Sequence, residues 1–290
     1  MPKVLLVGAS SQICGGWLTH SLVLGEYEIF YLSRNADVGN LERKGYLGTL
    51  LSNQLADKSF DLVVNFVGAS NHKMISDAPA ELNQAMGLSD QIALSLAIQG
   101  SHYLYLSSGA VYKDLPGDGA PPSLWNPTSF YAEEKLRAEL RHAEMSKTIR
   151  VADLRVFGYL DKPNGALPGS LIGDLWSAFE SGEAATLNPD GVLRDIAGPQ
   201  EIAMALDAIV EGVATGFFDL YTQSPAGSVE LAKGLGLEIE YLPDSNLALS
   251  PTGPKKSYFS TSRTLGSLGY APGRSTLEVV TEAFWRSKGS

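Results

Sequence analysis

"VLLVGASSQICGG", residues 4–16, is the stretch that decides the fold. Its first four residues form a short apolar run that stops at Gly8, which is typical of a buried strand in a parallel sheet. The glycine-containing turn and helical stretch that follow form an arrangement that can hold a pyrophosphate on backbone amides. Ser11 and Cys14 stand where a G-x-x-G-x-x-G pattern would have its second and third glycines. We expect a dinucleotide-binding turn here, with a purely structural turn as the alternative.

The first half of the chain alternates such apolar runs with helical patterns. Apolar residues recur at helical spacing over residues 80–99 and 131–145. Further apolar runs, each ending at small or polar residues, cover residues 27–33, 61–68, 102–108 and 149–158. Strands that alternate with helices predict an α/β fold with a doubly wound parallel (Rossmann) sheet.

The pattern changes after residue 158, where a Pro- and Gly-rich loop begins. A strand is expected over 217–222, and helices over 171–179, 199–212, 228–235 and 275–287. We therefore expect residues 1–158, with about 196–222, to form the NAD(P)-binding Rossmann domain. Residues 159–195 and 223–290 would form a smaller C-terminal α/β substrate-binding region.

Composition excludes several classes of protein. The 290 residues carry 32 acidic and 22 basic side chains, a net charge of −10, so a general nucleic-acid binder is not expected. One cysteine, Cys14, and four scattered histidines predict neither disulfides nor a metal site. The longest apolar runs fall short of the roughly 18 residues of a membrane span, and the N-terminus resembles a strand more than a signal peptide. We expect a cytoplasmic protein without a membrane partner.

The second expected strand ends in Ser33, Arg34 and Asn35. An acidic residue at this point would accept hydrogen bonds from the adenosine ribose of NAD. A cation flanked by hydrogen-bond donors suits a 2′-phosphate instead, so the sequence favours NADP(H), with NAD(H) as the alternative. An arginine on an ordinary loop is the simpler interpretation.

"SFYAEEK", residues 129–135, places Tyr131 and Lys135 on one face of a helix. An ammonium beside a phenol favours the phenolate and lowers the tyrosine pKa, which suits proton transfer near neutral pH. Ser107 or Ser108, at the carboxyl end of a strand, lies where doubly wound sheets bind ligands. A solvent-facing helix turn with ordinary charges is the competing interpretation.

Taken in this order, the motifs resemble the extended short-chain dehydrogenase/reductase superfamily, and within it the NAD-dependent epimerase/dehydratase family that acts on nucleotide sugars. The resemblance spans nearly the whole chain. It is carried by the turn at residues 4–15, "LSSGAVY" (106–112), "FYAEEK" (130–135), "NGALPGSLI" (164–172), "VLRDIAGPQEIAMAL" (192–206) and "LGYAPGRSTLEVV" (268–280).

The resemblance implies a role for each matching residue. Ser108, Tyr131 and Lys135 would be catalytic. The cofactor, bound also by Tyr131 and Lys135, would contact Gly8, Ser10, Ser11, Gln12, Ile13, Ser33, Arg34, Asn35, Val67, Gly68 and Asn83. The nucleotide-sugar substrate would contact Ser108, Gly109, Asn164 and Arg194. A homodimer through the helices at 83–99 and 131–145 is also implied.

The resemblance leaves several reactions to weigh. The acid/base pair of the 4,6-dehydratases would follow Ser108 directly, but Gly109 and Ala110 stand there and cannot transfer a proton. An epimerase-reductase of the GDP-fucose synthase kind needs a cysteine in the sugar pocket, and Cys14 lies in the cofactor turn. Arg34 favours reduction of a keto sugar by NADPH (a 4-ketoreductase), with an NAD-dependent 4-epimerase as the alternative. The complete Ser-Tyr-Lys set argues against a non-catalytic dinucleotide sensor.

Overall fold

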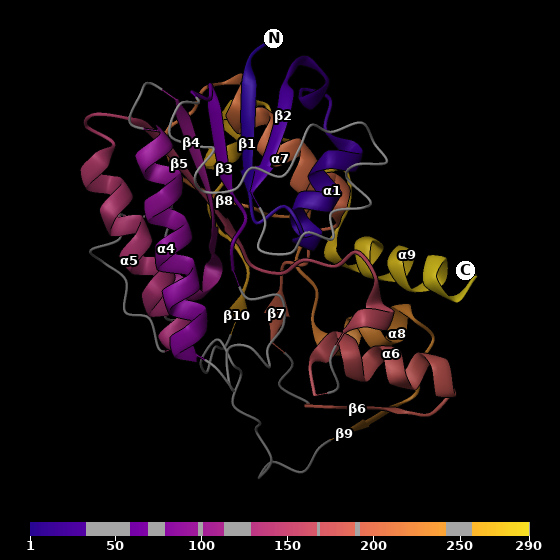
Figure 1. The fold of residues 1–290 in the computed structure, drawn as a ribbon. Coiled ribbons are helices and arrows are strands. Elements are labelled where there is room, and N and C mark those ends of the chain that lie inside the picture. The colour runs from indigo at the N-terminus through magenta and orange to yellow at the C-terminus, as the bar shows by residue number, and fades with distance from the viewer. Residues whose placement is uncertain are drawn as a thin grey trace.

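A six-stranded parallel sheet forms the centre of the computed structural model (Figure 1). The strand order is β2-β1-β3-β4-β5-β8, which confirms the predicted doubly wound sheet. The strands are Lys3–Val7 (β1), Glu28–Leu32 (β2), Leu62–Asn65 (β3), His102–Ser108 (β4), Arg150–Val156 (β5) and Gly216–Asp219 (β8). The structure describes residues 1–32, 59–68, 79–97, 101–112, 129–166, 169–188, 192–241 and 257–289. The chain reverses its direction across the sheet between β1 and β3, and at such a point the carboxyl ends of the strands leave a crevice for ligands.

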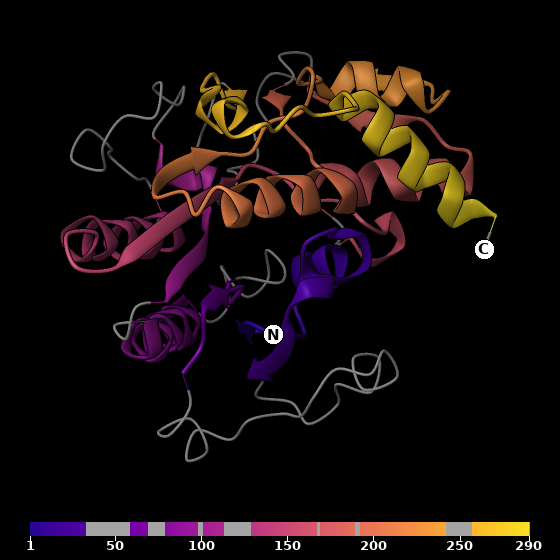
Figure 2. The ribbon, with the colours of Figure 1, turned by 90° about the horizontal axis from the view of Figure 1, so that it is seen from above.

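Helices cover both faces of the sheet (Figures 1 and 2). One face carries α4 (Pro79–Ala97) and α5 (Phe130–Met145), and the other carries α1 (Gln12–His20) and α7 (Pro199–Glu211). Where the sequence predicted these helices, the bounds agree to within two residues at each end. Within the described ranges, no helix is both long enough and apolar enough to cross a membrane.

The first strand shows why its sequence is a continuous apolar run. Val4 and Leu6 pack into the cluster on the α1 and α7 side, whereas Leu5 and Val7 pack into the cluster on the α4 and α5 side. Successive side chains of a strand point to opposite faces, so a strand covered by helices on both faces needs apolar residues at every position.

A smaller lobe lies below and to the right of the sheet in Figure 1. Its helices are Leu171–Ser181 (α6), Ser228–Gly234 (α8) and Thr276–Lys288 (α9), and a separate apolar cluster around Trp176, Phe179 and Phe284 joins them. Two short parallel pairs complete it: β6 (Ala185–Leu187) with β9 (Ile239–Tyr241), and β7 (Leu193–Arg194) with β10 (Ser257–Tyr258). The sequence did not predict these pairs, because two or three residues are too few to show a periodicity.

A buried histidine fastens α5 to α4 and to the sheet. His142 Nδ1 lies 2.6 Å from Asp153 Oδ1 on β5, and its Nε2 lies 2.9 Å from Asp90 Oδ1 on α4. Arg141 reaches the same Asp90 carboxylate at 2.7 Å. Burial lowers the pKa of His142, but the two carboxylates outweigh it and raise the pKa to about 10. The imidazolium between two carboxylates is therefore charged at neutral pH.

We expect His142→Gln to destabilise the protein in a pH-dependent way. Since the folded pKa is raised from 6.5 to about 10, the stabilisation is complete below 6.5 and is lost as the pH rises toward 10. At the acid end, loss of the cation between two buried carboxylates costs about 3–5 kcal/mol. Denaturant unfolding across this pH range measures the difference from wild type. His20→Gln, at an exposed site on α1, is the control. If the loss of unfolding free energy in His142→Gln does not shrink as the pH rises, His142 is not held charged between the two carboxylates.

Candidate active site

The turn after β1 is built around Gly8. Its φ of +78° lies in the left-handed region that favours glycine, and a Cβ there would stand 2.8 Å from Val67 Cγ2. The Gly8 N–H donates to Leu32 O at 2.9 Å, which fixes the turn to β2. Ser11 caps α1, its Oγ accepting a hydrogen bond from the Cys14 N–H at 3.3 Å. This shape brings the start of α1 to the switch point of the sheet.

The start of α1 offers backbone donors to an anion. Gln12 and Ile13 are its first two residues, and Ser10, exposed, precedes the cap. The first N–H groups of a helix have no partner within it and carry its positive dipole end. The predicted phosphate contacts therefore lie together at one helix end.

The close approach of helices at this turn occurs at Gly16 rather than at Cys14. A Cβ on Gly16 would stand 2.7 Å from Tyr159 Oη and 3.2 Å from Pro199 Cβ. Cys14 is fully buried in the core, and burial raises its thiol pKa far above the usual range. Gly16 was not predicted from the sequence, although the Gly15–Gly16 pair was the signal that could have identified it.

Gly68, after β3, lies over the predicted Tyr-Lys pair. A Cβ there would be 3.6 Å from Lys135 Nζ and 4.0 Å from Tyr131 Oη. Asn83 lies on α4, and its Oδ1 is buried without a hydrogen-bond partner in the part of the chain that the structure describes. A buried acceptor without a partner is costly unless a ligand donates to it. The Gly8 turn, the open start of α1 and this acceptor fit a dinucleotide.

Ser108, Tyr131 and Lys135 meet at the carboxyl end of β4. Ser108 is the last residue of that strand, and its Oγ accepts a hydrogen bond from the Ala110 N–H at 3.1 Å. Tyr131 and Lys135 occupy one face of α5, and the Ser108 hydroxyl acts to lower the pKa of Tyr131. By contrast, the Ser107 hydroxyl points to the buried carboxylate of Glu139.

Lys135 is held by three acceptors from the protein. Its Nζ donates to Leu106 O at 2.6 Å, to Tyr105 Oη at 3.1 Å and to Val67 O at 3.3 Å. It lies 6.0 Å from the centroid of the Tyr131 ring. Burial lowers the pKa of Lys135 to about 8, against the raising effect of nearby carboxylates. Lys135 is thus anchored by protein acceptors, with the Tyr131 ring nearby.

The pKa of Tyr131 differs from the expectation. Burial raises the pKa of the phenol, and the hydrogen bond from Ser108 only partly opposes this. The predicted lowering by Lys135 is therefore wrong for the protein alone, because burial disfavours the charged phenolate.

Gly109 has no room for a side chain. A Cβ there would collide with the ring of Phe157, at 2.4 Å from Cδ1, and Phe157 in turn stacks on Tyr112 with ring centroids 6.2 Å apart. No carboxylate can follow Ser108 in this conformation, which removes the acid/base pair that a dehydratase needs at this position. Tyr112 is a core residue, 2% exposed.

We expect Gly109→Ala to destabilise the protein by about 1–3 kcal/mol, because the added methyl overpacks the site against Phe157. Thermal and denaturant unfolding measure the loss. Gly165→Ala is the matched control, since a Cβ at Gly165 meets no atom within 4 Å. Equal stability of the two variants would contradict the packing that we describe.

The predicted phosphate ligand Arg194 lies on β7. Its Nε is buried and has no hydrogen-bond partner within the described ranges, and burial lowers the pKa of the guanidinium. Asp195, beside it, has a structural role: its carboxylate accepts hydrogen bonds from Thr222 Oγ1 at 2.6 Å and from the Ser260 N–H at 2.9 Å. Arg194 thus presents a donor that has no acceptor among the described residues, from a strand that Asp195 anchors.

Within the described ranges, no contact joins the remaining predicted residues to the Ser-Tyr-Lys cluster, and some of these residues lie outside those ranges. Asn164 is exposed in the 3-10 helix η5 (Pro163–Gly165), which packs on α6 and α9. Ser33, Arg34 and Asn35 lie outside the described residues, so the residues behind the NADP(H) prediction are not described.

Two tyrosines in the site were not predicted from the sequence. Tyr105 bonds Lys135, as described above, and Tyr258 Oη lies 3.3 Å from Ser108 Oγ. Tyr105 belongs to the apolar run of β4, where the sequence predicts only core. Tyr258 follows a stretch that carries no motif of its own. Both become visible only when β4, α5 and β10 are brought together.

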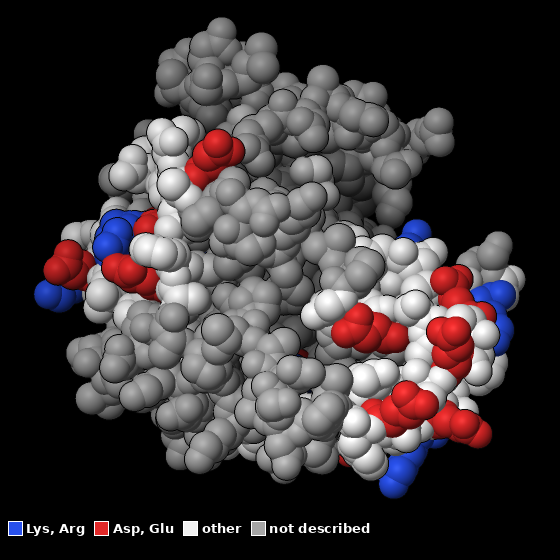
Figure 3. Space-filling model, turned by 90° about the horizontal axis from the view of Figure 1, so that it is seen from below, with Lys and Arg blue, Asp and Glu red and all other residues white. Residues whose placement is uncertain are grey.

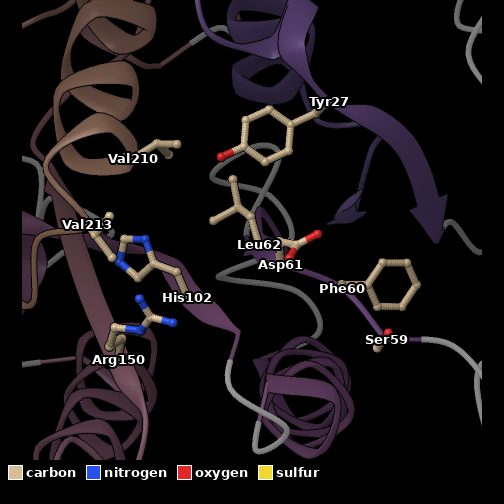
Figure 4. A pocket seen from close by; sticks show the side chains of 9 residues that line it. All are labelled: Tyr27, Ser59, Phe60, Asp61, Leu62, His102, Arg150, Val210 and Val213. Atoms are coloured by element: carbon tan, nitrogen blue, oxygen red, sulfur yellow. The ribbon is translucent and has the colours of Figure 1, made fainter. Parts of the chain in front are cut away.

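A cavity of about 390 Å³ lies at the opposite, amino-terminal edge of the sheet (Figure 4). It is lined among others by Tyr27, Asp61, His102 and Arg150. His102 begins the strand that Ser108 ends, so the two are separated by roughly 20 Å at the rise of a strand. This cavity is remote from the Ser-Tyr-Lys cluster.

Figure 3 shows acidic side chains, with some basic ones beside them, on the face of the smaller lobe that it presents. The lobe's exposed acidic residues include Glu180, Glu183, Glu230, Glu238 and Glu240. An anionic ligand in this lobe therefore depends on local cations and backbone donors to overcome the surrounding field.

Solved structures share this fold along the whole chain. UDP-glucuronic acid 4-epimerase from Bacillus cereus, in complex with UDP-glucuronic acid and NAD, is 17% identical with a TM-score of 0.78, over 99% of this chain and 99% of that one. UDP-glucose 4-epimerase from Thermotoga maritima, with UDP-glucose, is 14% identical with a TM-score of 0.78, over 99% and 100%. A double mutant of dTDP-glucose 4,6-dehydratase from Streptomyces venezuelae, with NAD bound, is 18% identical with a TM-score of 0.78, over 98% and 96%. No protein-family model and no curated protein matches the sequence.

Proposed function

We propose that the protein is an NAD-dependent 4-epimerase of a nucleoside-diphosphate sugar, in the extended short-chain dehydrogenase/reductase superfamily. The convergence of Ser108, Tyr131 and Lys135 at the carboxyl end of β4, beside the turn that follows β1, carries this proposal. Solved 4-epimerases with the same fold support it, because they cover almost the whole chain.

The dinucleotide would be held by the start of α1, by Val67 and Gly68, and by Asn83. Gly8 permits the turn, the backbone N–H groups of Ser10, Gln12 and Ile13 would face the pyrophosphate, and the buried Asn83 Oδ1 would accept a hydrogen bond. When bound, the nicotinamide supplies the two-electron oxidation and reduction that the protein's own side chains cannot perform.

Tyr131 is the proposed acid and base. Its phenol takes the proton of the sugar hydroxyl as the carbon is oxidised, and returns it to the same oxygen when the carbon is reduced from its other face. Ser108 orients that oxygen by a hydrogen bond, and the buried charge of Lys135 favours the deprotonated phenol.

The substrate diphosphate is proposed to bind Arg194, whose buried Nε has no acceptor within the described part of the protein. A guanidinium suits paired phosphate oxygens because of its planar set of donors. The region made of residues 159–195 and 223–290 would hold the rest of the nucleotide sugar, with Asn164 and Gly109 as further contacts.

The choice of epimerase over reductase follows from the cofactor. Only the residues at the end of the second expected strand, Ser33, Arg34 and Asn35, favoured NADP(H), whereas the solved structures that share this fold and hold a dinucleotide include complexes with NAD. A 4-epimerase returns its cofactor to the starting state in each turnover and needs no phosphorylated dinucleotide. A 4-ketoreductase that consumes NADPH remains the second candidate, on the strength of Arg34.

Bound nucleotide and cofactor titration test this choice. We expect NAD to be retained by the purified protein, and nicotinamide fluorescence to show no preference for NADPH over NADH. Arg34→Ala should then leave the affinity for NADH unchanged. A preference for NADPH that Arg34→Ala abolishes would contradict the epimerase and support the reductase.

We also propose a homodimer through α4 and α5. Three large apolar side chains on these helices are exposed: Leu88 at 57%, Phe130 at 69% and Leu140 at 43%. Burial of such side chains against a second copy would remove them from water. Light scattering on a sizing column should give twice the mass of the chain, and Leu88→Arg should reduce it to one chain.

A further inference from the structure

Ser108 lies between two phenols. Its Oγ is 3.3 Å from Tyr258 Oη, where either hydroxyl can donate, and its hydroxyl also opposes the rise in the pKa of Tyr131 on α5. Tyr258 lies on β10, is 8% exposed and packs edge-on against Phe157 with ring centroids 5.4 Å apart. Two tyrosine hydroxyls, from α5 and from β10, therefore compete for one serine hydroxyl.

The hydrogen-bonding capacity of Ser108 decides how they share it. A hydroxyl donates one hydrogen bond and accepts two. The Ala110 N–H already donates to Ser108 Oγ at 3.1 Å, which leaves one acceptor place and one donor. If one phenol donates to Ser108, the Ser108 proton is directed to the other phenol.

We assign Tyr258 as the donor because the proposed reaction needs Tyr131 to give up its proton. Burial raises the pKa of Tyr258 far above neutrality, so Tyr258 stays protonated. Arg194 is its register partner in the β7–β10 pair, and its cation makes the phenol O–H a stronger donor. Tyr131 has Lys135 on its own helix instead, with the Lys135 Nζ 6.0 Å from the centroid of the Tyr131 ring. The groups that face Tyr131 are Lys135 from α5, Tyr105 and Ser108 from β4, and Tyr258 from β10.

We propose that Tyr258 is a positioning residue that donates a hydrogen bond to Ser108 Oγ, so that the Ser108 proton points to Tyr131 and stabilises its deprotonated form. The effect on catalysis rests on the proposed function, whereas the effect on the pKa of Tyr131 can be measured without it. The β7–β10 pair would then contribute to both ends of the substrate site. Arg194 on β7 would bind the phosphates, and Tyr258 on β10 would orient Ser108 at the reacting sugar carbon.

Tyr258→Phe is the variant that tests the proposal, because it keeps the ring against Phe157 and removes only the hydroxyl. The pKa of Tyr131 is followed by NMR on protein with carbon-13-labelled tyrosine, and Tyr131→Phe identifies its signal. We expect Tyr258→Phe to raise this pKa by about one unit, since a hydrogen bond worth about 1.4 kcal/mol corresponds to one unit. The alkaline rise of kcat/KM should move by the same amount, with about a tenfold loss of kcat/KM at neutral pH.

Tyr112→Phe is the matched control. Tyr112 belongs to the same aromatic cluster and stacks on the same Phe157, but its hydroxyl bonds Asp219. An unchanged Tyr131 pKa in Tyr258→Phe, or an equal shift in Tyr112→Phe, would overturn the proposal. If no nucleotide sugar is turned over, the proposed function fails, whereas the NMR titration still decides the role of Tyr258.

Discussion

Tyr131→Phe should lose about a thousandfold in kcat while it binds NAD as tightly as wild type. General acid–base groups contribute about 10²–10⁴-fold, and the phenol hydroxyl is the only part that this change removes. Tyr131 Oη lies over Gly68 and beside Ser108, so the proton it moves is at the reacting end of the site. Turnover of the nucleotide sugar and equilibrium binding of NAD are measured on the same preparation.

The control for this prediction is the affinity of Tyr131→Phe for NAD, which should equal that of wild type. If Tyr131→Phe lowers the NAD affinity as much as the rate, Tyr131 has a structural role and the proposed mechanism is contradicted. If the rate is unchanged, another group moves the proton. A loss of turnover without a loss of NAD affinity also distinguishes an enzyme from a dinucleotide sensor, because a sensor would need no acid or base.

Arg155→Met should destabilise the fold by about 3–5 kcal/mol, since it leaves buried carboxylates without their cation. Arg155 lies on β5 with no exposed surface. Its Nη2 lies 3.1 Å from Glu139 Oε2 on α5, and its Nη1 lies 3.2 Å from Asp219 Oδ1 on β8. The guanidinium thus fastens α5, which carries Tyr131 and Lys135, to two strands of the sheet.

Denaturant unfolding of Arg155→Met measures this loss. Arg137→Met is the matched control on α5, where an exposed Arg137 bonds Glu133 at 2.6 Å. An exposed ion pair of this kind contributes roughly 0–1 kcal/mol. If the two variants lose equal stability, the buried network does not hold the fold in the way that we infer.

The strands and helices of the sheet were predictable because periodicity is a local property. Runs such as residues 4–7 and 102–108 are buried on both faces and therefore mostly apolar. The order of the motifs along the chain then located Ser108, Tyr131 and Lys135, although a Tyr and a Lys four residues apart are a weak signal alone.

What the sequence could not predict depends on pairs that are distant along the chain. Arg155 interrupts an apolar run, and its partner Glu139 comes from a helix whose packing the sequence does not specify. Tyr258 meets Ser108 across 150 residues. The direction of the Tyr131 pKa shift was also missed, because it depends on how deeply α5 buries the phenol, which helical spacing cannot show.

The measurement that tests the central claim most directly is inversion at C4 of a nucleotide sugar, followed by proton NMR. The purified protein is incubated with UDP-glucose, UDP-galactose and UDP-glucuronic acid in turn, without added cofactor. We predict that signals of the 4-epimer of one of these sugars appear, with no net change in the redox state of the bound nicotinamide. Consumption of one added NADPH for each sugar converted, or loss of water from the sugar, would contradict the proposed 4-epimerase.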